Sequence, residues 1–215
     1  MAELIDVFDA NLIAQGSMDR LQAHRDARWH RTFHCWVVNP KALPRLLFQV
    51  RSENVANFPG TLDVSAAGHI EAGETVAQGV REVREELGID FEESQLYPLG
   101  DRVEVADQAN GQRNREYQAV YLLREARELP DYSPQVEEIA GLLWLQIDDA
   151  LGLFSGSRDH ALATGIMYST ADSAWVAVER NVAMRDFLPR IQHYYLTAAI
   201  MADRLVKNQF PLAIS

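Results

Sequence analysis

The sequence contains one cysteine, Cys35, and few basic residues, and each shortage excludes a class of protein. A single thiol cannot form a disulfide within the chain, so we expect a reducing, cytoplasmic location rather than a disulfide-stabilised secreted scaffold. Lysine and arginine number 20 against 31 aspartate and glutamate residues, which gives a formal net charge of −11. This charge argues against nucleic-acid binding, which needs cations to replace counterions. A phosphate substrate stays compatible with it, because a bound divalent metal reverses the local charge.

Long hydrophobic runs are also missing. No stretch approaches the roughly 18 apolar residues of a membrane-spanning helix, so we expect no membrane partner. The N-terminus, MAELIDVFDA, is acidic and lacks a long apolar run, which is not typical of a signal peptide. Hydrophobic residues nevertheless make up 47% of the 215 residues, enough to bury a sizeable core.

Alternating apolar residues and turn signals predict a mixture of strands and a few helices. The expected strands are 3–8, 11–16 (or a loop), 32–39, 45–52, 61–67, 96–107, 115–125, 141–147, 161–169 and 174–182. The expected helices are 17–26 with Ser17 as the cap, 75–87, 148–154 with an aspartate cap, and 187–208. Strands that interleave with a central helix favour an α/β or α+β sandwich.

The pattern of the chain changes near residue 155. We therefore divide it into a main domain, 1–154, and an extension, 155–215, made of a hairpin and an amphipathic helix. The helix has its apolar residues at helical spacing, which is typical of a helix that covers a core. A contact in a homodimer is the alternative for the same apolar face.

Negative charge is concentrated in the stretch GHIEAGETVAQGVREVREELGI, residues 68–89. Glu82, Glu85 and Glu86 are three or four residues apart, so on a helix they share one face. Like charges at this spacing are mildly destabilising. A solvated helix face with partial compensation from Arg81 and a neighbouring arginine is one interpretation. The other interpretation is a metal site, because carboxylates beside a backbone carbonyl such as that of Gly68 are the hard oxygen ligands that Mg²⁺ and Mn²⁺ prefer.

The same stretch resembles the Nudix box, G-x5-E-x7-R-E-U-x-E-E-x-G-U, in which U is aliphatic. The matching residues are Gly68, Glu74, Arg81, Glu82, Val83, Glu85, Glu86, Gly88 and Ile89. The resemblance implies a Nudix α/β/α sandwich around a mixed sheet, with Glu82, Glu85 and Glu86 as Mg²⁺ (or Mn²⁺) ligands and Arg81 bracing them. The implied reaction is hydrolysis of a nucleoside-diphosphate-linked or related small-molecule diphosphate. A glutamate in the box or on a later loop, Glu137 or Glu138, would act as the base.

The box is one residue short, with six residues between Glu74 and Arg81 where the pattern has seven. A deletion inside a formed helix would rotate everything after it by about 100°. Because the end of the box is intact, we place the deletion where the loop enters the helix, near Gly79. The deletion affects the expected positions of Glu74 and Gly68 more than those of the helix glutamates.

The resemblance extends over about residues 3–150 to isopentenyl-diphosphate isomerase type 1 and its hydrolase-like relatives. It rests on HRTFHCWVVN, LLFQVRS, FPGTLDVSAAGHIEAGET, NREYQAVYLL and EEIAGLLWLQIDD. These isomerases have a catalytic cysteine just before the Gly-His of the motif, where this chain has Ala66 and Ala67. Their diphosphate-binding lysines are replaced by Val55 and Ala56. Without the thiol, protonation of an alkene lacks one of its two partners, so the residues favour hydrolysis over isomerisation.

Isomerases of this type also hold a metal with three histidines and two glutamates. Four of these positions match, at His24, His30, His69 and Glu116, while Asn114 replaces the second glutamate. The resemblance therefore leaves open a retained histidine metal site, with ordinary packed or surface histidines as the alternative.

Two further residues are candidates for substrate binding. Arg51 ends a strand and can fork onto phosphate oxygens, or it can form a surface salt bridge. Glu116, an acid within an apolar strand, indicates a site or a satisfied sheet edge. A Nudix-fold module that binds a nucleotide without turnover is the third functional alternative.

Overall fold

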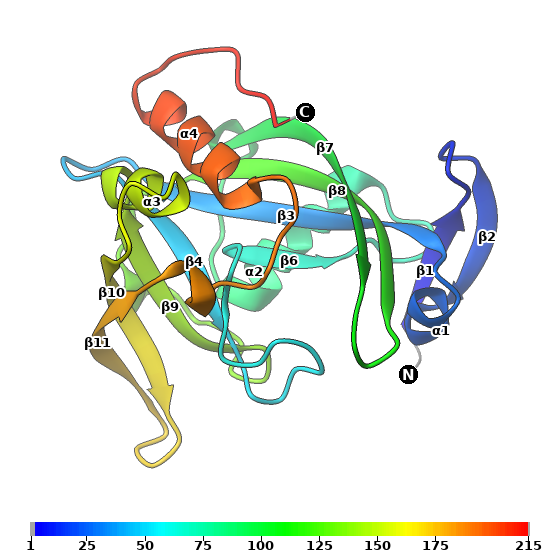
Figure 1. The fold of residues 1–215 in the computed structure, drawn as a ribbon, viewed down its shortest axis with the longest axis horizontal. Helices are drawn as coiled ribbons and strands as arrows, with labels where there is room; N and C mark the ends of the chain where they lie inside the picture. Colours follow the sequence, from blue (N-terminus) through cyan, green and yellow to red (C-terminus); the bar gives the residue numbers. More distant parts are fainter. Residues whose placement is uncertain (1–2, 215) are drawn as a thin grey trace.

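The computed structural model describes residues 3–214, which form one twisted sheet with helices on both of its faces (Figure 1). The strands are β1 (Leu4–Phe8), β2 (Ala14–Asp19), β3 (Trp29–Asn39), β4 (Arg45–Arg51), β5 (Leu62–Asp63), β6 (Ala66–His69), β7 (Leu96–Asp107), β8 (Arg113–Arg124), β9 (Ile139–Gln146), β10 (Ala161–Ser169) and β11 (Ala174–Val182). The α-helices are α1 (Arg20–Arg25), α2 (Arg81–Leu87), α3 (Ile147–Phe154) and α4 (Tyr194–Val206). Short 3₁₀ helices occupy Val76–Val80, Glu93–Gln95, Leu129–Asp131 and Met184–Asp186.

The sheet is mixed. Its main path runs β11-β10-β9-β4-β3-β1-β2, with β5 beside β4, β6 beside β3, and β8 between β3 and β7. Strands β3 and β8 are parallel, so His30 is level with Glu116 and Thr32 is level with Gln118. Strand β6 runs antiparallel to β3 and places His69 opposite Thr32. Through these two pairings, His69 at the end of β6 lies close to the first residues of β3 and to Glu116 and Gln118 in β8.

Alternation along β3 separates the core into two parts. Trp36 and Val38 pack in a cluster with α3 and α4, whereas Phe33, Cys35 and Val37 pack on the other side, against α2. Successive strand residues face opposite sides of a sheet, so β3 is buried on both faces. The expected mixed α+β sandwich is confirmed.

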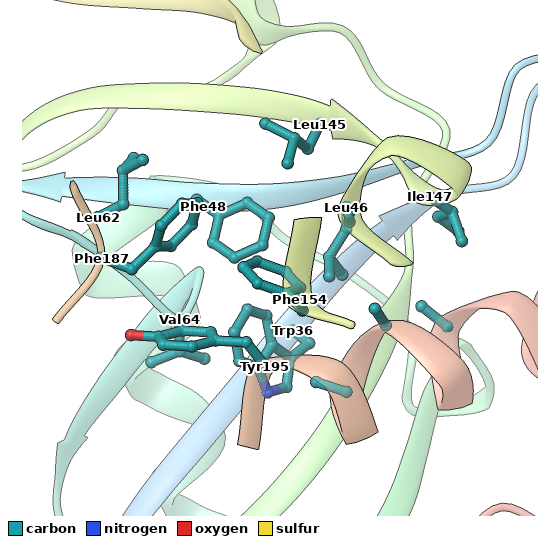
Figure 2. Packing of buried hydrophobic residues seen from close by; sticks show 14 of the residues in the cluster. Trp36, Leu46, Phe48, Leu62, Val64, Leu145, Ile147, Phe154, Phe187 and Tyr195 are labelled. Atoms are coloured by element: carbon teal, nitrogen blue, oxygen red, sulfur yellow. The ribbon is translucent and has the colours of Figure 1, made fainter. Parts of the chain in front are cut away.

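Aromatic side chains fill the larger part of the core. Figure 2 shows Trp36, Phe48, Phe154, Phe187 and Tyr195 converging from the sheet, α3 and the C-terminal segment. The rings of Phe154 and Tyr195 stack with centroids 5.3 Å apart. The start of α4 is thereby packed onto the sheet, with Tyr194 and Tyr195 buried.

Several predicted helix boundaries were wrong for identifiable reasons. Helix α1 is capped by Asp19, whose Oδ1 accepts a hydrogen bond from the Gln22 amide at 3.0 Å, while Ser17 lies in β2 and donates to Asp6. Helix α3 has Gln146 at its cap position, with Asp148 and Asp149 in its first turn.

The terminal helix begins at Tyr194 rather than at 187. Pro189 disfavours helical backbone at the residue before it, and that residue, Leu188, donates its amide to Leu62 in β5. Gln192 and His193 then adopt left-handed backbone before α4 starts. The helix packs its apolar face on the core, and the β10–β11 hairpin continues the sheet beyond β9 and projects from its edge (Figure 1). The domain boundary at 154 stays a prediction. Within residues 3–214, no helix has both the length and the apolar character needed to cross a bilayer.

Candidate active site

Helix α2 carries the glutamates of the motif. The single helix predicted over 75–87 is instead a 3₁₀ turn followed by α2. The 3₁₀ segment Val76–Val80 occupies the place where the motif is one residue short. A 3₁₀ turn advances the chain with fewer residues per turn than an α-helix, which suits a shortened connection. Gly88, in left-handed conformation, ends α2.

Arg81 binds the acidic side chains of the motif together. Its Nε donates to Glu74 at 2.9 Å, and its Nη1 donates to Glu82 at 2.8 Å and to Glu85 at 3.0 Å. Its Nη2 donates to the carbonyl of His69 at 3.2 Å. Glu74 therefore reaches Arg81 despite the shortened box.

Strand β6 packs directly against α2 through two close contacts. The amide of Ala67 donates to Oε2 of Glu86 at 3.0 Å. A Cβ at Gly68 would overlap the carboxyl group of Glu82, so only glycine allows this approach. Gly68 thus lies beside the glutamates, as the motif predicts.

Burial gives these glutamates unusual electrostatics. Desolvation raises the pKa of Glu82 to about 7, against the opposing effect of Arg81, and the charges of Glu85 and Glu138 act in the same direction as burial. Burial, followed by the charge of Glu82, also holds the pKa of Glu86 well above its usual range. Glu85 is exposed. The cluster has more carboxylates than Arg81 can neutralise, so a bound cation would reduce the repulsion between them.

Arg51, at the end of β4, and Glu138, in the turn just before β9, lie beside this cluster. The amide of Ser52, next to Arg51, donates to the carbonyl of Glu138 at 2.8 Å. The guanidinium of Arg51 lowers the pKa of Glu86, and the carboxylate of Glu138 raises it, so both charges are within electrostatic range of the helix. Arg51 is also held by Asp63 at 3.6 Å and by the carbonyl of Asn57 at 3.0 Å.

A second group of potential ligands lies at the far end of β6. The ligand nitrogens of His24, His30 and His69 are all within 4.8 Å of one another; we call these three residues the histidine cluster. Nε2 of His24 and Nε2 of His69 are 3.1 Å apart. Burial lowers the pKa of His24 to about 4 and lowers the pKa values of His30 and His69, so all three are neutral near pH 7.

The histidine cluster has the donors that a metal ion requires. His30 donates from Nδ1 to the carbonyl of Arg28 at 2.8 Å, which leaves the lone pair on its buried Nε2 without a partner. Glu116 Oε1 is 4.0 Å from that nitrogen. Neutral imidazoles whose ring nitrogens lie close together beside a carboxylate fit a transition metal such as Zn²⁺.

Glu116 belongs to a buried polar network with five residues that were not sequence-based candidates, namely Asp63, Arg102, Glu104, Gln118 and Arg190. Desolvation raises the pKa of Glu116, with a hydrogen bond from Gln118 acting against it. Burial also acts to raise the pKa of Asp63, but the charges of Arg190 and Arg51 more than offset this and hold it below its usual range. In the sequence, Asp63, Arg102 and Glu104 lie inside predicted strands, whereas Arg190 lies inside the predicted helix 187–208.

The structure therefore brings the predicted site residues together in two adjoining groups. Arg81, Glu82, Glu85, Glu86 and Gly68 form the first, with Arg51 beside it. Glu116 is separate from them and belongs to the second group, with the histidine cluster. Strand β6 joins the two, because Arg81 binds the carbonyl of His69.

Comparison with known proteins identifies similar sequences and folds. The family model described as the NUDIX domain matches residues 28–164. An uncharacterised Nudix hydrolase of Clostridium acetobutylicum is 31% identical over 204 residues, which cover 94% of this chain and 98% of the relative. An isopentenyl-diphosphate Delta-isomerase of Klebsiella pneumoniae is 27% identical over 185 residues, covering 82% of this chain and 91% of the isomerase.

Among solved structures, the crystal structure of DR0079 from Deinococcus radiodurans superposes with a TM-score of 0.56 at 24% identity. The match covers 73% of this chain and 91% of that protein. It supports the fold. The resemblance to the Nudix family is confirmed at the level of sequence, and an isomerase homologue matches at lower identity.

Proposed function

Because the chain belongs to the Nudix hydrolase family and is a pyrophosphohydrolase, we propose that it hydrolyses a small nucleoside-diphosphate-linked or related diphosphate with Mg²⁺ or Mn²⁺. The observation that carries the proposal is the placement of Glu82 and Glu85 on one guanidinium, that of Arg81, with Gly68 beside Glu82 and with Glu86 held at β6 by the Ala67 amide. These residues would hold the metal through hard oxygen atoms. When bound, such an ion neutralises diphosphate charge and makes water a better nucleophile.

The chain's own residues have separate tasks in this proposal. Arg81 fixes the carboxylates of Glu82 and Glu85 by donating to both. Arg51, 24% exposed at its side chain, contacts a substrate phosphate from the end of β4. Glu138 is exposed beside the cluster and takes a proton from the attacking water.

The histidine cluster supports a second metal site rather than the isomerase reaction. The converging imidazole nitrogens favour metal binding, and Glu116 supplies an oxygen. Ala66 and Ala67 occupy the positions at which the isomerases have their cysteine, so no thiol is available there to protonate an alkene. An ion held there would bind the substrate's diphosphate.

Phosphate or nucleotide release from a panel of nucleotide sugars, dinucleoside polyphosphates and deoxynucleotides with Mg²⁺ tests the proposal. We expect turnover of at least one member, and a Glu85→Gln variant slower by at least roughly a hundredfold, about 2.7 kcal/mol of barrier. Glu93→Gln, an exposed glutamate away from α2, is the matched control and should retain full activity.

Other outcomes would identify the alternatives. Tight binding of one panel member with no turnover would support a nucleotide-binding module. Rearrangement of isopentenyl diphosphate without phosphate release would support the isomerase. A cytoplasmic location and a homodimer through the C-terminal helix stay predictions.

A further inference from the structure

Residues 165–214 lie beyond the segment that the family model matches, yet Arg190 from this segment is buried against the sheet. Its side chain is 8% exposed. Its Nη2 donates to both oxygens of Asp63, each at 2.8 Å, and its Nη1 donates to Glu104 Oε1 at 3.3 Å. The C-terminal extension is therefore tied to β5 and β7 by charged hydrogen bonds.

The network continues from Glu104 into the sheet. The second oxygen of Glu104 accepts a hydrogen bond from Nη1 of Arg102, and the same nitrogen donates to Oε1 of Gln118. Nη2 of Arg102 donates to the carbonyl of Ile191 at 3.2 Å, and its guanidinium lies 4.4 Å from the ring centroid of Tyr194. The C-terminal extension thus holds Arg102 directly, and also indirectly through Glu104.

Gln118 connects Arg102 to Glu116 through the two ends of its side-chain amide. A glutamine amide has one acceptor end and one donor end. Because Oε1 of Gln118 faces Arg102, its Nε2 faces Glu116 and donates to Oε2 at 2.7 Å. The reverse orientation would place two oxygens against each other. The remaining oxygen of Glu116, Oε1, is the one 4.0 Å from Nε2 of His30.

We propose that Arg190 is a positioning residue for Glu116 and, through it, for metal binding at the histidine cluster. The inference rests on the second metal site proposed above. Arg190 touches none of the ligands; it anchors Glu104, which anchors Arg102, which orients Gln118. Residues in this outer layer fix ligand orientation, and losing one typically weakens metal binding by roughly 10–100-fold.

The test uses the full chain and Co²⁺, whose visible absorption reports the atoms that bind it, with excess Mg²⁺ present to occupy the glutamate site. Removing Arg190 alone would take two 2.8 Å hydrogen bonds from buried Asp63 and leave it only the 3.6 Å contact with Arg51, which would destabilise the fold. The variant Asp63→Asn/Arg190→Met removes both charges and keeps the Glu104–Arg102 pair. Arg180→Met is the matched control, because Arg180 lies in the same extension and pairs at 3.6 Å with Asp186, outside the network.

We expect the double variant to bind Co²⁺ at least about tenfold more weakly than Arg180→Met. Its absorption bands should shift in the direction seen for Glu116→Gln, a signature that general loosening of the fold would not reproduce. Arg190→Lys, which keeps the charge but lacks the planar fork, should give a smaller loss with the same direction of shift.

Two results would overturn the inference. Affinity and bands equal to those of the Arg180→Met control, in the double variant or, if that fails to fold, in Arg190→Lys, would remove the positioning role and leave the metal site standing. Co²⁺ binding by the wild type that His30→Ala leaves unchanged would remove the histidine metal site, and this inference with it.

Discussion

Replacing Gly68 with alanine should damage the glutamate site while leaving the fold intact. The added Cβ would overlap the carboxyl group of Glu82, which is the free end of a flexible side chain. Nonbonded carbons lie about 3.5 Å apart, so this carboxyl would have to move by more than about 1 Å. That movement would break its 2.8 Å contact with Arg81 and take it out of the metal site.

The magnitude follows from the cost of misplacing a catalytic group. A displacement of this size typically lowers the rate roughly 10²-fold, or about 2.7 kcal/mol. Gly68 does not have a left-handed φ, so alanine adds no backbone strain. We therefore expect the free energy of unfolding to change by no more than about 0.5 kcal/mol.

Gly73→Ala is the matched control for Gly68→Ala. Gly73 has φ +82° and no atom within 4 Å of an added Cβ, so alanine there should cost about 1–2 kcal/mol of stability and leave the rate per folded molecule unchanged. The assays are Mg²⁺-dependent phosphate release under saturating substrate and urea unfolding. Full activity in Gly68→Ala would refute the placement of Glu82 in the site.

Three further predictions concern stability and pH. In metal-free protein, Glu82→Gln should raise the free energy of unfolding by about 3 kcal/mol at pH 8. Burial raises the pKa of Glu82 from 4.5 to about 7, so its carboxylate destabilises the fold as pH rises through this window. The stability gained in the variant should therefore vanish below pH 4.5. Equal gains at pH 8 and below pH 4.5 in urea titrations would contradict this prediction. Tyr194→Phe should cost about 2–3 kcal/mol by urea unfolding, since its hydroxyl is the partner of two buried ring nitrogens; a loss below 1 kcal/mol would count against this. Gly88→Ala should cost more than Gly156→Ala in thermal unfolding, because both have left-handed φ but only at Gly88 would a Cβ meet a backbone carbonyl; equal losses would contradict this steric account.

The glutamate group could be predicted from the sequence because the information for it is local. The spacing of Glu82, Glu85 and Glu86 requires them to share a helix face wherever that helix lies. Helix geometry alone likewise predicts the position of the deletion, and a 3₁₀ turn occupies that place. Exact helix starts were harder to predict, because capping by Asp19 and the backbone turn before Tyr194 depend on neighbouring strands.

The buried polar network could not be predicted in the same way. Asp63 and Arg190 are 127 residues apart, and only the packing of the C-terminal segment across the sheet brings them together. Local periodicity marks Arg102 and Glu104 as strand residues but does not say which face of their strand is covered. The meeting of three histidines from α1, β3 and β6 also depends on tertiary structure, and the sequence indicated it only through family resemblance.

We propose that three carboxylates of α2 hold the catalytic divalent cation. Anomalous diffraction from crystals soaked in Mn²⁺ tests this assignment. We expect manganese density bounded by Glu82, Glu85 and Glu86, and its loss in Glu82→Gln crystals. Manganese found only at the histidine cluster, with those three side chains pointing apart, would contradict the assignment.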